Sequence, residues 1–245
     1  MTEAEYELAC GHHGKRPSAF VCKHLLSASG GGFHWGIDEQ APDALCPDAW
    51  CDACETMLRA EGAWTDRAVA DADIKMVCEL CYEKFRERNW GDDSKELKRV
   101  TKAGVTFLDK RQKKLEQQYK LTGYDRWDWN QEAGQLLFSQ AGQRRLFADM
   151  VLVGSLSTRT NAWLWSWANP STEESVKSKT REVRRYGEKH HILKLACARW
   201  RTTSEQDAWE MTGAAALLIG AVGAYRTPSD SGFTFMLLTS VNWAQ

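Results

Sequence analysis

The sequence predicts an α+β protein in which an antiparallel sheet packs with helices, preceded by a small zinc-stabilised module. Seven of the eight Cys residues lie before residue 82, an arrangement typical of a metal-binding module. From residue 94 onward, apolar residues first recur every three or four positions and then alternate, as in a helix followed by strands. Residues 1–94 contain 18 acidic and 9 basic residues, a net charge of −9, against +8 for the remainder.

The change in composition near residue 90 predicts two domains, a Cys/His zinc-binding module over residues 1–90 and a Trp-rich α+β domain over 91–245. Hydrophobic residues make up 43% and charged residues 27%, which excludes a disordered or fibrous protein. The N-terminal segment lacks the basic start and apolar run of a secretory signal. The longest apolar stretch, residues 211–225, is shorter than the roughly 20 residues of a spanning helix. We therefore expect a cytoplasmic protein with reduced thiols and no membrane partner.

Two CxxC pairs form the clearest motif of the first domain. Cys51 and Cys54 make the first pair, and Cys78 and Cys81 make the second, 23 residues further on. Two thiolates three positions apart on a tight turn converge on one cation, and two such pairs complete a tetrahedral shell with zinc–sulfur bonds of about 2.3 Å. The spacing therefore predicts an all-thiolate zinc site.

A second set of ligand-type residues precedes these pairs. Cys10 and His13 form a CxxH motif. Cys22 and His24 lie in a segment that alternates like a strand, so that both side chains share one face. Two thiolates with two imidazoles form a common structural zinc shell, and we expect a second zinc ion here.

The spacing leaves alternatives open at this site. His12 is able to replace His13, and His34 and Cys46 are spare candidates. The ligands can also interleave, for example with the CxxH motif sharing a metal with the first CxxC pair. The sequence does not choose among these pairings.

Both zinc ions are expected to be structural. A catalytic zinc keeps an open position for water beside a general base, whereas four protein ligands close the shell. No GxSxG, P-loop, HExxH or GxGxxG motif occurs in the chain. The sequence therefore predicts two Zn²⁺ ions and no catalytic residue.

Periodicity sets the expected elements of the second domain. Helices are expected over 94–121, 172–186 and 204–222, with Gly187 ending the second one. Strands are expected over 126–130, 135–139, 145–157, 162–168, 224–226 and 233–241.

Five Trp residues alternate along two of these strands and are the candidate binding residues: Trp127, Trp129, Trp163, Trp165 and Trp167. Alternate side chains of a strand point to one face, so the five form a broad aromatic surface if the strands are adjacent. Two interpretations stay open. The surface packs against the helices as core, or it forms an aromatic groove for a peptide, a small ligand or exposed bases.

Short motifs in the second domain carry a resemblance to a known family. They are Trp-Asp-Trp-x-Gln at 127–131, Val-Gly-Ser at 153–155, Trp-x-Trp-x-Trp-Ala-Asn at 163–169 and Arg-Tyr-Gly-Glu at 185–188. Because of these motifs, residues 95–245 resemble a bacterial family of uncharacterised domains. The resemblance implies no established activity, but such domains resemble bacterial conflict and immunity proteins in general character.

The first domain resembles a Cys/His module of bacterial proteins of unknown role. The shared pattern is Cys-x-x-His-Gly, Phe-Val-Cys-x-His-Leu, Trp-Cys-x-x-Cys-Glu and Cys-x-x-Cys-Tyr. This resemblance favours His13 over His12 and leaves Cys46 outside the pattern.

These observations predict a non-enzymatic, zinc-stabilised protein that binds another protein, in the manner of a bacterial immunity or defence factor. One alternative is a nucleic-acid-associated regulator, because residues 177–201 hold nine Lys or Arg and such a stripe is able to track phosphates. This alternative is not favoured, because the first domain is acidic. The other alternative is an enzyme with its site in the Trp-lined groove.

Overall fold

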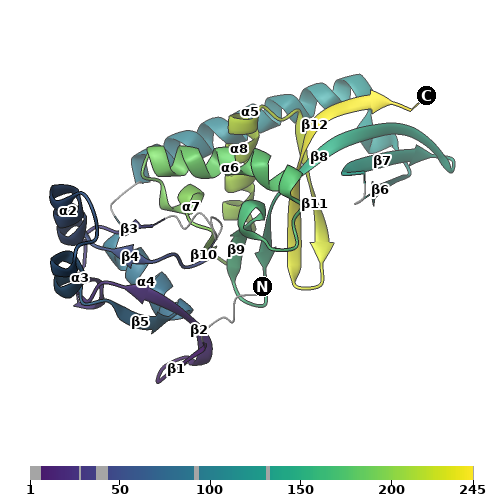
Figure 1. Cartoon of the computed structure of the whole chain (residues 1–245). Helices are drawn as coiled ribbons and strands as arrows, with labels where there is room; N and C mark the ends of the chain where they lie inside the picture. The colour runs from purple at the N-terminus through teal and green to yellow at the C-terminus, as the bar shows by residue number, and fades with distance from the viewer. Residues whose placement is uncertain (1–6, 28, 37–43, 91–93, 131–132, 245) are drawn as a thin grey trace. The chain divides into compact units, whose positions relative to one another are not determined.

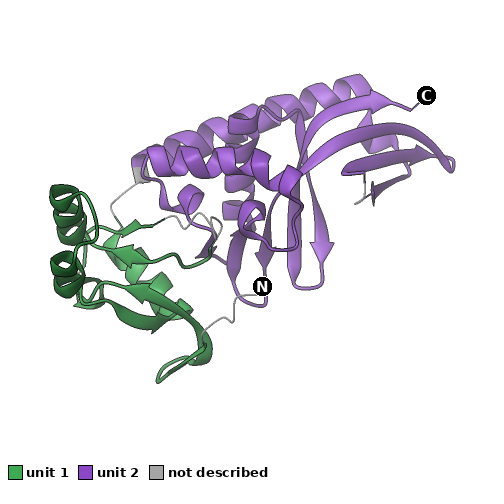
Figure 2. Cartoon of the chain, in the orientation of Figure 1, with its two compact units in different colours: residues 1–92 green, residues 93–245 purple. Residues whose placement is uncertain are grey.

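The computed structural model describes residues 7–27, 29–36, 44–90, 94–130 and 133–244. The chain divides into two compact units, residues 1–92 (unit 1) and residues 93–245 (unit 2), which Figure 2 distinguishes by colour. That each unit folds on its own stays a prediction.

Unit 1 is built around strand β2 (Gly14–Val21), which pairs with three other strands. Its partners are β1 (Glu7–Cys10) and β5 (Lys75–Cys78), both antiparallel, and β4 (Ala49–Trp50), which is parallel. The remaining elements are β3 (His34–Trp35), α1 (His24–Ser27), α2 (Asp52–Glu61), α3 (Asp66–Ala72) and α4 (Glu79–Asn89), as labelled in Figure 1. The core contains Val21, Leu25 and Tyr82, together with buried cysteines.

Unit 2 contains a seven-stranded antiparallel sheet, whose longest strand is β8 (Gln143–Ser157). β12 (Gly232–Trp243) pairs along nearly the whole of β8. β7 (Gln135–Gln140) pairs with the first half of β8 and β9 (Ala162–Trp165) with its last residues. The outer strands are β6 (Arg126–Asn130), β10 (Arg199–Arg201) and β11 (Gly223–Ser229).

Four α-helices pack with this sheet, which confirms the predicted α+β class. They are α5 (Ser94–Tyr119), α6 (Glu174–Lys189), α7 (Leu193–Ala196) and α8 (Glu205–Ile219). α8 contacts β8, β11 and β12, and α5 contacts β11 (Figure 1). Within the described residues, no helix combines the length and the apolar character that crossing a membrane requires.

The predicted hairpin, the long strand, the final strand pair and the three long helices are confirmed, with ends shifted by a few residues. Two details of the prediction are wrong. The strand expected over 162–168 ends at Trp165 and continues as a 3₁₀ turn over Ser166–Ala168. Gly187 lies inside α6 rather than at its end. A Cβ at this position would lie 2.5 Å from the backbone nitrogen of Ala196, so the glycine serves close packing of α6 on α7.

Another pair of glycines sets the approach of α5 to α8. A Cβ added at Gly104 would lie 2.4 Å from the carbonyl carbon of Gly213. Real Cβ atoms do not come that close to backbone, so the two helices pack together only because Gly104 lacks a side chain.

We expect Gly104→Ala to lower the free energy of unfolding of unit 2 by about 1–3 kcal/mol, because the new methyl group forces the helices apart. Alanine favours an isolated helix by up to about 1 kcal/mol over glycine, so a net loss reports the packing contact. Thermal unfolding followed by circular dichroism measures the effect. Gly123→Ala is the control, since a Cβ there has no heavy atom within 4 Å. Equal stability of the two variants would contradict the expected clash.

Candidate metal centres

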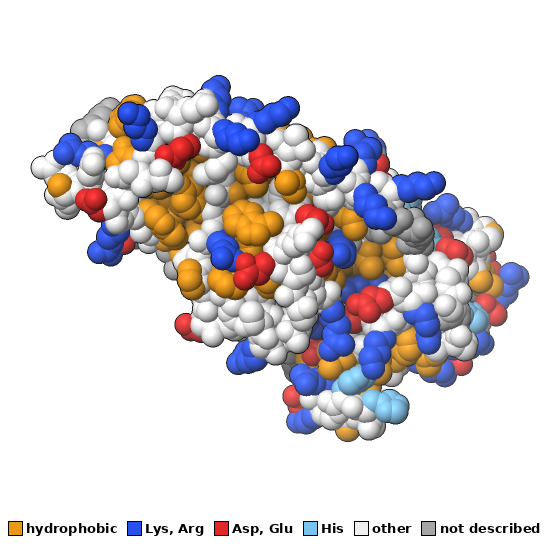
Figure 3. Space-filling model, turned by 180° about the vertical axis from the view of Figure 1, so that it is seen from behind, with side chains coloured by type: hydrophobic (Ala, Val, Ile, Leu, Met, Phe, Trp, Pro, Cys, Tyr) orange, Lys and Arg blue, Asp and Glu red, His pale blue; other side chains and the backbone are white. Residues whose placement is uncertain are grey.

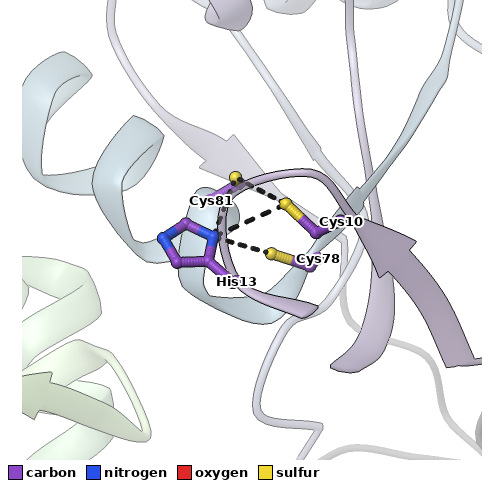
Figure 4. Close-up of side chains that lie close together, drawn as sticks. All are labelled: Cys10, His13, Cys78 and Cys81. Atoms are coloured by element: carbon purple, nitrogen blue, oxygen red, sulfur yellow. Dashed lines mark hydrogen bonds between the residues drawn. The ribbon is translucent and has the colours of Figure 1, made fainter. Parts of the chain in front are cut away.

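The first cluster consists of Cys10, His13, Cys78 and Cys81, whose candidate ligand atoms all lie within 4.8 Å of one another. Cys10 and His13 lie at the turn between β1 and β2, and the two other cysteines lie where β5 meets α4. Figure 4 shows the three sulfurs and the imidazole facing one another. His13 Nδ1 lies 3.3 Å from the Cys78 sulfur and 3.5 Å from the Cys81 sulfur.

The second cluster consists of Cys22, His24, Cys51 and Cys54, again with all candidate ligand atoms within 4.8 Å. Cys22 directly follows β2, and His24 begins α1. Cys51 and Cys54 lie where β4 meets α2, and the Cys54 sulfur is 3.3 Å from His24 Nδ1.

The interatomic distances fit the edges of a coordination tetrahedron. Metal–sulfur bonds of about 2.3 Å and metal–nitrogen bonds of about 2.0 Å place two sulfurs roughly 3.8 Å apart and a sulfur and a nitrogen roughly 3.5 Å apart. In the first cluster, the sulfurs of Cys10 and Cys81 are 3.9 Å apart. A disulfide would place them about 2.05 Å apart, and none of the eight cysteines forms a disulfide. Both groups therefore have the geometry to hold a metal ion.

The structure corrects the predicted grouping of the ligands. The two CxxC pairs do not share a shell, and the interleaving considered above, with Cys10 and His13 beside Cys51 and Cys54, does not occur either. Instead, each cluster combines one CxxC pair with one Cys/His pair. The result is two sets of three thiols and one imidazole rather than one all-thiolate set and one mixed set.

Strand direction explains this grouping. β5 runs antiparallel to β2, so Cys78 at the end of β5 lies opposite Ser18 in the middle of β2 rather than at its end. β4 runs parallel to β2, and Ala49 pairs with Val21, so Cys51 arrives beside Cys22 at the end of β2. The two clusters consequently lie at opposite ends of the same strand.

Each CxxC pair opens a helix. Cys51 is the N-cap residue of α2 and Cys78 that of α4, and neither side chain makes a capping hydrogen bond. The unpaired N–H groups and the positive end of the helix dipole at this position favour thiolates.

Burial shifts the pKa of several thiols in the two clusters. Burial, followed by the neighbouring thiols Cys78 and Cys10, raises the pKa of Cys81 to about 12. Burial raises the pKa of Cys22 and Cys54 as well. Cys10 differs, because a backbone hydrogen bond at His12 lowers its pKa to about 6. A cation bound between the thiols would favour their deprotonated form.

The clusters differ in access to solvent. In the second cluster Cys22, Cys51 and Cys54 are at most 3% exposed. In the first cluster, Cys10 and Cys81 are only half-buried. Lys84 Nζ lies 3.3 Å from His13 Nε2, which places a cationic side chain beside the first cluster. Lys84 is not among the residues predicted from the sequence, although its position three residues after Cys81 on one helix face could have indicated it.

The spare ligand candidates belong to neither cluster. His12 is exposed, and Cys46 packs against the core of unit 1. His34 Nε2 lies 2.7 Å from a carboxylate oxygen of Asp52, with which it forms a hydrogen bond.

The candidate Trp surface does not form. Trp163, Trp165 and Trp167 are at most 1% exposed and belong to the core of unit 2. Trp165 donates a hydrogen bond to the carbonyl of Lys194. The ring of Trp163 packs edge-to-face against the ring of Trp165. Trp127 is half-buried against Tyr225, and Trp129 is 36% exposed. Burial of the three central indoles excludes them as the wall of an open groove, which corrects their assignment as binding residues.

The fold and the clusters define an α+β protein whose N-terminal unit holds two sets of metal-ligand-type side chains. Residues 98–241 match a family described as a family of unknown function (DUF6882). Because this match spans more than half of the chain, the chain belongs to this family. The match begins within α5 and ends within β12, so it contains neither cluster. No curated protein and no solved structure matches the chain.

We expect about two metal ions per chain by elemental analysis. Cys51→Ser should lower this number and unfold unit 1, because ligation supplies roughly 10–16 kcal/mol of apparent folding free energy per small site. Unit 2 should stay folded, as judged by its amide NMR signals. Cys46→Ser is the matched control and should retain both ions. A metal-free chain that keeps unit 1 folded in a chelator would contradict the expectation.

We also expect the two ions to leave at different rates. A chromogenic chelator should remove the ion of the half-buried first cluster faster, giving a biphasic release curve. A single phase in the wild-type chain would show that exposure does not control release.

Proposed function

We propose that this chain is a non-enzymatic protein-binding protein whose N-terminal unit is held together by two structural Zn²⁺ ions. The observation that carries the proposal is an apolar patch on unit 1. It consists of Trp64, Val69, Ile74 and Met76, which are 37–47% exposed.

The donor sets support zinc and a structural role for it. A tetrahedral set of three thiolates and one imidazole binds zinc in preference to magnesium or calcium. Four protein donors leave no coordination position for a substrate or an activated water. The proposed ions therefore stabilise the fold and take no part in a reaction.

The apolar patch supports protein binding. Its residues come from the segment between α2 and α3, from α3, from the connection between α3 and β5, and from β5. Met76 of β5 pairs with Phe20 of β2. A group of exposed large apolar side chains on a folded surface is typical of an interaction site. Aromatic residues and methionine are also enriched in protein interfaces.

The two other candidate functions have less support. Several basic residues of 177–201 are paired within the chain: Arg181 with Glu174, Arg184 with Glu188, Arg185 with Glu182, and Lys194 with Asp207. On the face drawn in Figure 3, acidic side chains likewise lie among the basic ones. This mixing weakens the case for a phosphate-tracking stripe. The burial of Trp163, Trp165 and Trp167 leaves an enzyme site in the Trp groove with less support.

We further propose a cytoplasmic role as a bacterial immunity or defence factor. This narrower proposal rests on the resemblance of the second domain to bacterial domains of that general character. Its test is the identity of the protein that the apolar patch binds.

Tagged full-length protein should capture a defined partner from host extract, identified by mass spectrometry. Val69→Lys and Met76→Lys should each abolish capture, because a charge at the centre of an apolar interface is strongly unfavourable. Trp243→Lys is the control, since Trp243 is 60% exposed on unit 2 and lies outside the patch. Capture that survives both patch variants, or no capture at all, would contradict the proposed function.

A further inference from the structure

The sheet of unit 1 has two chemically different faces. Val21 and Ala49, which pair in parallel register, are buried on the core face. Their neighbours Phe20 and Trp50 point to the opposite face, because side chains alternate along a strand. Met76 pairs with Phe20 and lies on that same outer face. The outer face is therefore aromatic and apolar, although it is not the core.

A pocket of about 190 Å³ opens on this outer face. Its lining includes Phe20 of β2, Trp50 of β4, Trp64 from the segment between α2 and α3, and Val69 of α3. The volume is roughly six times the ~30 Å³ that one water molecule occupies in the liquid. It therefore leaves room for a branched group of several heavy atoms.

Two indole rings form one corner of the pocket. The centroids of Trp50 and Trp64 are 5.1 Å apart, and their planes meet at 83°. Trp50 is held in place, because its Nε1–H donates a 2.7 Å hydrogen bond to Glu55, whose carboxylate also accepts from Arg59. A group seated in the corner formed by two nearly perpendicular rings contacts the face of a ring. The face of an aromatic ring attracts cations.

The polar lining has the charge that a cation requires. Asp48 lines the pocket, and none of the described lining residues is basic. An unmodified ammonium keeps three N–H donors and a strong hydration shell, whose loss this mainly apolar lining would not offset. A methylated ammonium keeps the charge but lacks those donors. Aromatic walls with a nearby carboxylate are suited to such a group.

Aliphatic surface extends from the aromatic corner. Val69 and Ile74 line the pocket, and Met76 of β5 lies two residues after Ile74. These side chains are 43–47% exposed, which makes them available to an alkyl chain. A lysine side chain provides such a chain, with its charged nitrogen at the end.

We propose that this pocket binds a trimethylated lysine side chain of a partner protein. The trimethylammonium head occupies the corner between Trp50 and Trp64 near Asp48, and the butyl chain lies along Val69 and Ile74. The inference deepens the proposed function, on which it rests for the identification of a protein as the carrier of the lysine.

Four probes test the inference on the full-length chain by isothermal titration calorimetry. They are Nα-acetyl-Nε-trimethyllysine amide, the unmodified acetyl-lysine amide, a neutral isostere in which carbon replaces the charged nitrogen, and choline. We expect the trimethyllysine probe to bind roughly tenfold or more tightly than the neutral isostere and the unmodified lysine. Equal binding of the neutral isostere would overturn the cationic assignment. If choline bound as tightly as the trimethyllysine probe, this would overturn the claim that the ligand is a lysine side chain of a partner protein.

Variants locate the binding in the pocket. Trp64→Ala should abolish binding of the trimethyllysine probe, while Trp243→Phe on unit 2 should leave it unchanged. Asp48→Asn should weaken binding of the trimethyllysine probe several-fold and leave binding of the neutral isostere unchanged. A merely structural effect would weaken both. Metal content and indole N–H NMR signals verify folding of each variant. Unchanged discrimination in Asp48→Asn, together with unchanged binding in Trp64→Ala, would place the ligand elsewhere and overturn the inference.

The probe titration and the capture experiment fail independently. Trimethyllysine binding without a captured protein would contradict the proposed protein-binding function and leave the pocket chemistry standing. Capture that is abolished by Val69→Lys but unaffected by Trp64→Ala, without probe binding, would overturn the pocket assignment alone.

Discussion

The two clusters each connect chain segments that are far apart in the sequence. The first joins residues 10–13 to residues 78–81, and the second joins residues 22–24 to residues 51–54. Burial, followed by the neighbouring thiols, raises the pKa of Cys81, and a cation between the thiols would oppose this effect. Metal ligation contributes roughly 10–16 kcal/mol per small site, as much as the entire 5–15 kcal/mol stability of an ordinary domain. With the proposed ions bound, the fold of unit 1 would therefore depend on metal ligation more than on its small apolar core.

The grouping of the ligands also distributes charge evenly. An all-thiolate site around a divalent ion carries a net charge of −2, and a site with two thiolates and two imidazoles is neutral. The observed grouping gives each ion three thiolates and one imidazole, so that each site would carry −1. Lys84 beside His13 places a compensating charge near the more exposed site. This distribution would lower the summed cost of desolvating the two sites, because that cost grows with the square of the net charge.

The sequence allowed the ligand residues to be predicted but not their grouping. Spacing identifies Cys51 with Cys54 as a chelating pair, because a tight turn is a local property. Which pairs then meet depends on whether β4 and β5 run parallel or antiparallel to β2, and that relation is set by tertiary structure. The same reason explains the tryptophans. Alternation places Trp163 and Trp165 on one face, but only packing against the rest of unit 2 shows that this face is buried. Gly187 is a further case, since a helix stop and a close helix contact call for the same residue type.

The second cluster and the proposed ligand pocket share their supporting strands. Phe20 lies two residues before Cys22, and Trp50 directly precedes Cys51. A metal ion that fixes Cys22 and Cys51 therefore also fixes the relative position of the two strand ends that carry the aromatic walls. A metal ion bound at the buried second cluster would thus pre-organise the proposed pocket without contacting its ligand, which would reduce the entropy lost on binding.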